Sequence, residues 1–376
     1  MKLNIILFTV FSSVVVQAAT YYVSTTGSDS NPGTSTKPWR NPNKCALSPI
    51  KAGDICIVRS GTYTDTDLDG ITVYIRGSAP AGTTSLPITI KSETPLGATI
   101  QVPSSVNAAN AAFYVSRSNY IIDGFNITGG TKNFSNGSYA GIVFNSTYAN
   151  GAIARNNSIH HIGRSVCSNS VYGYSGIFLH GSANVLVEKN QIYSIGRRRN
   201  GESGCVTNLF QNDHGIYIAG SANLILRRNV FYDTNRGFPI HFYGGTTTNA
   251  NVYHNTISGK SPTGKPAGQI KLASNISGMN IKNNISSDAS YGMVTFYSLT
   301  ASKVVVSNNI STGPDRYGSA AGVSFSSNIQ NIANMGFVNK LLNNFRLTST
   351  SPARNRGVLI GPSVPDGKPD LGAYEY

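Results

Sequence analysis

The chain has 376 residues, of which 39 are glycine and 12% are charged, and its formal net charge is +14. This composition is typical of a soluble, turn-rich chain, and the length suits a single elongated domain. The positive charge favours a polyanionic partner. Because Lys and Arg are scattered, an acidic polysaccharide is favoured over nucleic acid. The alternative is that the charge serves only solubility.

Residues 1–18 have the pattern of a secretory signal peptide. Lys2 supplies the positive start, Ile5 to Val16 form the apolar stretch, and residues 16–18 resemble a small-residue cleavage site. This stretch is too short to span a membrane, and no later stretch is long enough. We therefore expect residues 19–376 to be secreted, soluble and without a membrane partner, and we expect no encounter with cytoplasmic nucleic acid.

The four cysteines fit an oxidising compartment. Cys45 and Cys56 lie close together near the start, whereas Cys167 and Cys205 lie in two long insertions. We predict disulfides between Cys45 and Cys56 and between Cys167 and Cys205, which is one of three possible pairings. No Cys-x-x-Cys or His-x-x-x-His spacing indicates zinc.

Two features precede the repeats. Residues 41–51, ahead of an expected strand at Asp54–Val58, are predicted to form an N-terminal cap. The run Asp65-Thr66-Asp67-Leu68-Asp69-Gly70 matches the first half of a calcium loop. Arg76 stands where that loop requires a bidentate Glu, which excludes an EF-hand. A solvated acidic turn is favoured over a lone calcium site, and no other cofactor is expected.

Six five-residue segments share one alternating pattern. They begin at Gly141, Gly176, Gly215, Pro239, Gln269 and Met293. In each segment the second and fourth residues are large and apolar, whereas the third and fifth vary. Alternation with period two predicts a strand with one buried face.

A second set of segments follows the first and contains an Asn, any residue, and then an apolar residue. The aligned asparagines are Asn157, Asn190, Asn229, Asn255, Asn283 and Asn308. Stacked amides can hydrogen-bond one another, so this column is interpreted as structural. Coils of roughly 24 residues are too short for propeller blades of about 40 residues. The repeats predict an all-β solenoid, a single-stranded parallel β-helix of about ten coils with an N-terminal cap.

Short motifs at both ends resemble those of secreted right-handed parallel β-helix proteins. They are Tyr21-Tyr22-Val23-Ser24, Gly27-Ser28-Asp29-Ser30-Asn31-Pro32-Gly33-Thr34, Ala52-Gly53-Asp54, Gly61-Thr62-Tyr63 and Asp370-Leu371-Gly372-Ala373-Tyr374-Glu375. That family includes pectate-lyase-like and alginate-lyase-like enzymes, uronan C5-epimerases, some glycoside hydrolases and proteins without known activity. The resemblance implies the right-handed fold over nearly the whole mature chain and leaves the activity open.

The alignment places the third and fifth residues of the first set on an outward face. The third positions are Val143, Phe178, Tyr217, His241, Lys271 and Thr295, and the fifth are Asn145, His180, Ala219, Tyr243, Ala273 and Tyr297. Stacked strands lie about 4.8 Å apart, so aligned side chains on neighbouring coils touch. We therefore predict a contiguous row of Tyr217, His241 and Lys271, with His180, Tyr243 and Tyr297 beside it.

Three arginines recur five residues after an apolar residue of the second set. They are Arg164, Arg197 and Arg236, which we expect to stack along one edge of the first sheet. They are predicted to bind substrate carboxylates, with splaying into water as the alternative. Insertions at Ser165–Ser175 and Arg198–Asp213 lie on the same side, where a disulfide would join them as one wall of a groove.

This surface suits β-elimination of a uronic-acid polymer. The reaction requires neutralisation of the sugar carboxylate, a base for the C5 proton and an acid for the leaving O4. Arg236, helped by Arg197, is predicted to neutralise the carboxylate. His241 or Lys271 is the predicted base, if its pKa is lowered by its neighbours.

Tyr217 or Tyr243 is the predicted acid for the same reaction, with His180 and His214 as reserves for either role. The remaining substrate-binding candidates are Arg164, Arg197, His180, His214 and Tyr297. We thus predict a secreted, monomeric polysaccharide lyase acting on an anionic polysaccharide, with no metal at the site.

Three alternatives stay open. A uronan C5-epimerase uses the same first two steps and returns the proton from the other face. A glycoside hydrolase needs a pair of carboxylates, and the nearest candidates, Asp213 and Asp233, lie on turns. The third alternative is a non-catalytic carbohydrate-binding surface protein on the same fold.

Overall fold

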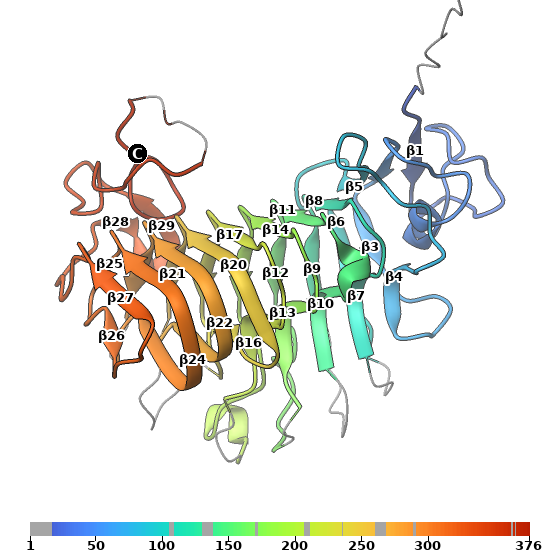
Figure 1. The fold of residues 1–376 in the computed structure, drawn as a ribbon. Helices are drawn as coiled ribbons and strands as arrows, with labels where there is room; N and C mark the ends of the chain where they lie inside the picture. The colour runs from blue at the N-terminus through green and yellow to red at the C-terminus, as the bar shows by residue number, and fades with distance from the viewer. Residues whose placement is uncertain are drawn as a thin grey trace, which may run out of the picture.

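The strands form one long solenoid that runs from β1 (Thr20–Val23) at one end to β27 (Val323–Ser326) at the other, and β29 (Asn344–Leu347) packs beside its coils (Figure 1). The computed structural model describes residues 17–104, 109–129, 138–169, 172–206, 211–234, 236–259, 268–288, 291–361, 364 and 366–376. Most of the predicted signal peptide, and residues 170–171 and 207–210 of the two insertions, lie outside these ranges.

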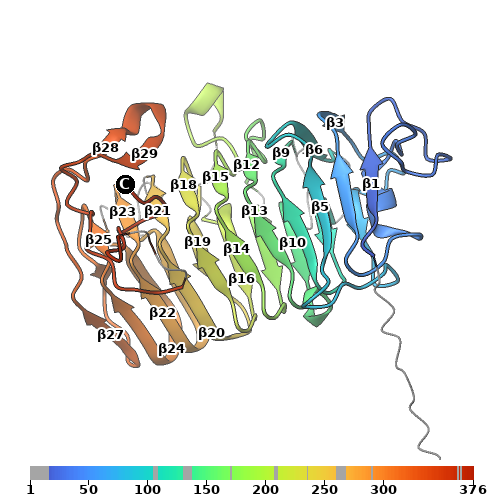
Figure 2. The ribbon, with the colours of Figure 1, turned by 90° about the horizontal axis from the view of Figure 1, so that it is seen from above.

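Successive coils pair in parallel and build three stacks of strands, so the predicted parallel β-helix is confirmed (Figure 2). The first stack contains β4 (Ile71–Ile75), β7 (Ala109–Val115), β10 (Ser138–Asn145), β13 (Tyr174–His180), β16 (His214–Ala219), β19 (Ile240–Phe242), the starts of β22 (Ile270–Lys282) and β24 (Val294–Ser307), and β26 (Arg316–Tyr317). The candidate site lies on this stack.

The other two stacks complete each coil. The second contains β1, β2 (Ile55–Val58), β5 (Ile88–Ser92), β8 (Tyr120–Asp123), β11 (Ile153–Arg155), β14 (Leu186–Glu188), β17 (Ile225–Arg227), β20 (Thr246–Tyr253), the ends of β22 and β24, and β27 (Val323–Ser326). The third contains β3 (Gly61–Tyr63), β6 (Ala98–Val102), β9 (Asn126–Gly129), β12 (Ser158–His160), β15 (Gln191–Tyr193), β18 (Val230–Tyr232), β21 (Thr256–Ser258), β23 (Ile285–Ser287) and β25 (Ile310–Ser311).

Short elements complete the fold at its ends and edges. β28 (Phe337–Asn339) pairs with β29 in antiparallel orientation. The 3-10 helices are η1 (Pro42–Ala46), η2 (Thr147–Ala149), η3 (Glu202–Gly204) and η4 (Lys340–Leu342). η1 packs against β4, the first strand of its stack, and the Tyr74 amide donates to Asn43 Oδ1 at 2.7 Å. η1 therefore forms part of the cap that was predicted for residues 41–51.

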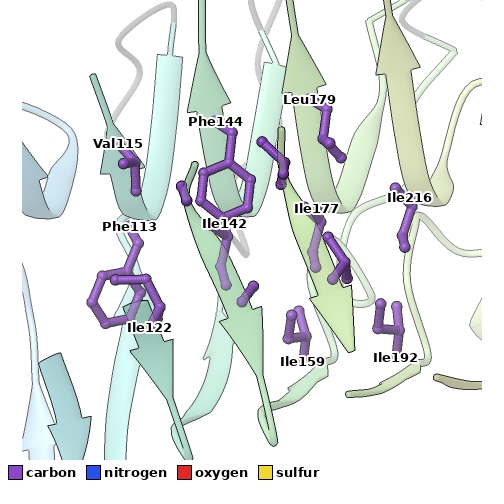
Figure 3. Close-up of a cluster of buried hydrophobic side chains, with 14 of the residues drawn as sticks. Phe113, Val115, Ile122, Ile142, Phe144, Ile159, Ile177, Leu179, Ile192 and Ile216 are labelled. Carbon is purple, nitrogen blue, oxygen red and sulfur yellow. The ribbon is translucent and has the colours of Figure 1, made fainter. Parts of the chain in front are cut away.

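The core is a set of apolar columns inside the coils. Phe113, Ile142, Ile177 and Ile216 are fully buried and occupy the same register position on successive strands (Figure 3). Burying each such side chain stabilises the fold by about 1.5–3 kcal/mol. The second and fourth positions of the first repeat set thus face inward, as predicted.

A second internal column consists of stacked asparagines, and its register differs in part from the prediction. The amide Oδ1 of Asn190 accepts hydrogen bonds from the backbone and side-chain nitrogens of Asn157 at 3.1 and 3.0 Å. The same bonding continues through Asn229, Asn255, Asn284, Asn309 and Asn328. The prediction of Asn283 and Asn308 is therefore wrong by one residue. Both occupy the left-handed turn position just before the column, with φ of 55° and 56°.

We expect Asn229→Ala to lower the free energy of unfolding by about 3 kcal/mol, because it leaves several buried polar groups without partners. Asn229 is fully buried, accepts from Asn190 and donates to Val187 O and Asn255 Oδ1. Urea unfolding measures the change. Asn275→Ala, at an exposed asparagine on β22, is the control and should cost less than about 0.5 kcal/mol. Equal losses in the two variants would contradict a structural role for the column.

Both predicted disulfides are confirmed. Cys45 in η1 is bonded to Cys56 in β2, and Cys167 is bonded to Cys205. The second bond joins the two insertions that lie beside the first stack. No helix among the described residues is long and apolar enough to cross a membrane.

The C-terminal segment packs back along the coils and encloses His254. His254 Nδ1 donates to Asp370 O at 3.1 Å, and its Nε2 accepts from Asn283 Nδ2 at 3.0 Å. This bonding requires a neutral ring, and burial lowers the pKa of His254 to about 4. A proton on Nε2 would oppose the Asn283 amide, so the bonding fails when the ring is protonated.

Because His254 is buried as a neutral ring, we expect the folded protein to lose stability in acid. Above pH about 6.5 the ring is neutral in both the folded and unfolded chain, so its contribution is fully present. Between about 6.5 and 4 the unfolded chain binds the proton first, and this contribution is lost. Thermal unfolding from pH 8 to 4 should therefore show a smaller decline in Tm for His254→Asn than for the parent protein. Asparagine tolerates the φ of 54° at this position. Parallel declines would contradict the prediction.

Candidate active site

One row of side chains crosses the outer face of the first stack. Phe178 on β13, Tyr217 on β16, His241 on β19, Lys271 on β22 and Thr295 on β24 are opposite one another in register. This is the predicted order. Adjacent strands lie about 4.8 Å apart, so the side chains of Tyr217, His241 and Lys271 form a continuous surface.

A cleft of about 520 Å³ lies over this row. Tyr217, His241 and Lys271 of the row form the floor, and residues at the ends of the two insertions form the sides. The lining residues are Tyr172, Gly173, Ser175, Gln211, Asn212, His214, Tyr217, Phe238, His241, Tyr243, Lys271 and Tyr297. No Asp or Glu is among these described residues, and Lys271 is the one Lys or Arg among them. The cleft is therefore suited to an anionic ligand.

Two buried histidines form a pair at the cleft floor. His214 Nδ1 accepts a hydrogen bond from the Phe238 amide at 3.1 Å, and His214 Nε2 lies 3.0 Å from His241 Nδ1. Burial lowers the pKa of His214 to about 3 and that of His241 well below its ordinary value. Gly237 permits this packing, because a Cβ there would lie 1.9 Å from the Asp213 carbonyl oxygen.

Lys271 is half-buried beside the histidines. Its Nζ donates to Phe296 O at 3.2 Å and lies 5.5 Å from the ring centroids of Phe238 and Tyr297. No carboxylate of the described residues forms an ion pair with it. Burial lowers the pKa of Lys271. A lysine with a lowered pKa is in its neutral form, the form that can accept a proton, more often than a solvated lysine is.

Tyr217 keeps its proton more firmly than an ordinary tyrosine. Its ring stacks on Phe178 at 5.1 Å and on His214 at 5.2 Å between centroids. Burial, and to a lesser extent Tyr243, raise the pKa of Tyr217 to about 12. Tyr243 stacks on His241 at 5.5 Å and, like Tyr297, is exposed at the mouth of the cleft. Tyr217 is therefore protonated near neutral pH, and its hydroxyl can donate a hydrogen bond.

The family described as "Right handed beta helix region" matches residues 104–265 and 199–340, more than half of the chain. The chain belongs to this family. The right-handed β-helix that the terminal motifs implied is thus confirmed. No curated protein matches the sequence.

Solved structures of polysaccharide-active proteins share this right-handed β-helix fold. An alginate lyase from Paenibacillus sp. str. FPU-7 superposes with a TM-score of 0.53 and 16% identity, over 83% of this chain and 95% of that chain. The pectate lyase Pel9A gives a TM-score of 0.49 and 15% identity, over 95% of this chain and 96% of its own. A rhamnogalacturonan lyase gives 0.45 and 14%, over 89% and 96%. At these identities the likeness shows the fold alone.

In this right-handed β-helix the three predicted arginines lie beneath the cleft wall and not in the cleft. Arg197 is buried, and its Nε and Nη2 donate to Asp213 Oδ2 and Oδ1 at 3.0 and 2.9 Å. Arg164 donates to Arg197 O at 2.8 Å and pairs with Glu202. Arg236 is buried and donates to Arg198 O. The expected stacking along one edge is present, but the expected placement of the guanidinium groups in the groove is corrected.

Asp213 explains why these arginines turn inward. Its carboxylate accepts from the Arg197 side chain, from the Arg197 amide at 2.9 Å and from the Tyr174 amide at 3.0 Å. It therefore fixes the base of both insertions next to His214. From the sequence, Asp213 was identified only as a carboxylate on a turn. Its ion pair with Arg197 could not be inferred from the spacing of the two residues.

One predicted site residue, His180, and the acidic turn of residues 65–70 lie outside the cleft. His180 is exposed, lies 3.3 Å from Asn145 Oδ1 through Nδ1, and is not among the lining residues. Carboxylate oxygens of Asp65, Asp67 and Asp69 lie within 4.8 Å of one another, and Arg76 pairs with Asp69 at 2.7 Å. This acidic turn precedes β4, several coils away from the cleft on β16, β19 and β22.

Proposed function

We propose that this protein is a polysaccharide lyase that cleaves a uronic-acid polymer by β-elimination. The observation that carries the proposal is the floor of the cleft, where Lys271, not ion-paired to any carboxylate of the described residues, is in register with His241 and Tyr217. A basic, aromatic cleft without a carboxyl group among its described lining residues suits a chain of sugar carboxylates. The likeness to an alginate lyase is consistent with the proposal at the level of fold.

Lys271 is the base and Tyr217 the acid in the proposed reaction. Neutral Lys271 Nζ takes the proton from C5 of the uronate, and the C–H electron pair forms the C4–C5 double bond. The C4–O4 bond breaks at the same time, and O4 leaves with the proton of the Tyr217 hydroxyl. Exchange with water then moves the proton from Lys271 to Tyr217 and restores both groups. The burial that lowers the pKa of Lys271 favours its role as the base, and the raised pKa of Tyr217 keeps on its hydroxyl the proton that the acid must supply.

Hydrolysis is disfavoured by the composition of the cleft. A glycosidase needs two carboxyl groups flanking the scissile bond. No carboxyl group lies among the described lining residues, and Asp213 is held by Arg197. Asp233 lines a different hollow, on the side of β15 and β18.

The proposal is tested by incubating the purified protein with alginate, pectate, glucuronan and glycosaminoglycans. The ultraviolet absorbance of newly formed unsaturated ends reports β-elimination, and we expect it with at least one of these polymers. New reducing ends without that absorbance would indicate hydrolysis. Exchange of the C5 proton with deuterated solvent, without cleavage, would identify a C5-epimerase. Binding with neither reaction would identify a non-catalytic carbohydrate-binding protein, and each of these three outcomes overturns the lyase.

The Cys167–Cys205 disulfide joins the two insertions whose ends line the cleft. We expect the double replacement Cys167→Ser and Cys205→Ser to raise KM by about tenfold with little change in kcat, because substrate binding must then order the wall. The matched control is Cys45→Ser with Cys56→Ser, at the buried bond near β2. Its loss should cost about 2–4 kcal/mol of unfolding free energy and leave KM unchanged in the folded enzyme. A KM that changes equally in both double variants would contradict this role.

A further inference from the structure

The hydrogen bonds of the histidine pair determine where each proton lies. A backbone N–H can only donate, so the bond from the Phe238 amide requires a bare lone pair on His214 Nδ1. A neutral imidazole carries its proton on one nitrogen, so the proton of His214 lies on Nε2. A second proton on His214 would have to occupy Nδ1 and would oppose the Phe238 amide. The geometry therefore keeps His214 neutral.

The same reasoning passes from His214 to His241. His214 Nε2–H faces His241 Nδ1 at 3.0 Å, so His241 Nδ1 is the acceptor. The proton of a neutral His241 then lies on Nε2. No described residue accepts or donates a hydrogen bond at that atom, and His241 lines the cleft between Tyr217 and Lys271. Protonation of Nδ1 would place two N–H groups against each other and is disfavoured as well.

We propose that His214 is a positioning residue that holds His241 as the neutral Nε2–H tautomer, so that His241 donates a hydrogen bond to the carboxylate of the bound sugar. A ring with Nε2 protonated has no lone pair toward the cleft and cannot be the base. Lys271 is therefore the base, and the choice between His241 and Lys271 left by the sequence is resolved. The donor role rests on the proposed function, whereas the tautomer does not.

His241 also takes the role that the sequence gave to the arginines. Because Arg197 and Arg236 are buried beneath the wall, His241 on the cleft floor takes their place at the carboxylate, as a neutral hydrogen-bond donor and not as a cation. A neutral imidazole N–H strengthens its hydrogen bond as negative charge grows on the carboxylate during proton removal. A neutral imidazole also adds no positive charge next to Lys271. An imidazolium would add one and would oppose the positive charge that Lys271 gains when it accepts the proton.

The tautomer can be measured directly, without substrate. The chain contains six histidines, so a long-range proton–nitrogen correlation spectrum of protein labelled with nitrogen-15 histidine is simple enough to assign, with His241→Phe identifying the signal. We expect at pH 7 an His241 ring with protonated Nε2 and bare Nδ1. A protonated Nδ1, or a ring protonated on both nitrogens, would overturn the inference whatever the enzyme's activity.

Two variants at His214 then test the positioning role. His214→Phe keeps a ring but removes the donor, and we expect mixed tautomers of His241 and a fall in kcat of about 10²-fold. His214→Gln can place an amide N–H near the former Nε2 position, and should keep the Nε2–H tautomer and recover kcat to within about tenfold. Equal losses of kcat in both variants, with the His241 tautomer unchanged, would overturn the positioning role. If no polymer is cleaved by the parent protein, the proposed function fails while the tautomer still stands or falls by its spectrum.

Discussion

Lys271→Ala is expected to lower kcat by at least about 10³-fold, since it removes the group that accepts the C5 proton. Lys271→Arg should be almost as inactive, because a guanidinium keeps the positive charge but does not release its proton near neutral pH. Both variants should retain the fold, because Lys271 is half-buried and its hydrogen bond to the described residues is one contact with the Phe296 carbonyl oxygen. The rate of formation of unsaturated ends measures the effect.

The matched control for this prediction is Lys91→Ala. Lys91 is also partly exposed on a strand, β5, but lies far from the cleft lining. Its replacement should leave kcat within about twofold of the parent value.

In the parent enzyme, kcat/KM should rise with pH as Lys271 loses its proton. The midpoint of this rise should lie below the ordinary pKa of lysine, because burial lowers the pKa of Lys271. Full activity in Lys271→Ala would overturn the assignment of the base.

Asp213→Ala is expected to lower the free energy of unfolding by about 3–5 kcal/mol, the cost of leaving a buried charge without its counter-ion. The side chains of Asp213 and Arg197 are 0% and 1% exposed and are joined by two hydrogen bonds. The loss also removes the acceptor of the Tyr174 amide. Denaturant unfolding measures the change, and a lower midpoint with an unchanged m value would indicate destabilisation of the same folded state.

Asp123→Ala is the matched control for Asp213. Asp123 accepts from Arg155 Nε at 2.8 Å, but this arginine is about a third exposed, at 36% of its side chain. A pair in contact with water contributes about 0–1 kcal/mol. Replacement of both Asp213 and Arg197 by leucine and methionine should recover part of the stability, because no unpaired charge remains. If Asp213→Ala cost no more than Asp123→Ala, the pair would not stabilise the base of the insertions.

The register of the site was predictable because stacking enforces it. Once Ile142, Ile177 and Ile216 are aligned as core residues, the outward residues between them must align as well, and Tyr217 falls beside His241. The alternation needs only short-range information. Each coil repeats the alternation, so a wrong alignment of one strand would conflict with the pattern of the strands on either side.

The parts that were not predictable depend on choices that spacing leaves open. Asn283 and Asn284 are adjacent and chemically identical, and only the backbone decides which one takes the left-handed turn and which enters the column. The arginines recur at a regular interval, yet Asp213 determines that Arg197 turns inward. Similarly, the tautomer of His241 depends on the Phe238 amide, which belongs to a turn between coils.

The asparagine column keeps the strands of neighbouring coils in register whatever the number of residues in each coil. Consecutive members of the column are between 19 and 39 residues apart in sequence, yet each makes the same amide bonds to the next. A segment can therefore be lengthened or exchanged between two column residues without shifting the strands on either side. The insertion at residues 198–213 lies in the 39-residue interval and supplies Gln211 and Asn212 to the cleft. Substrate preference can thus diverge, in evolution or in the laboratory, by transplanting loops onto a constant set of coils.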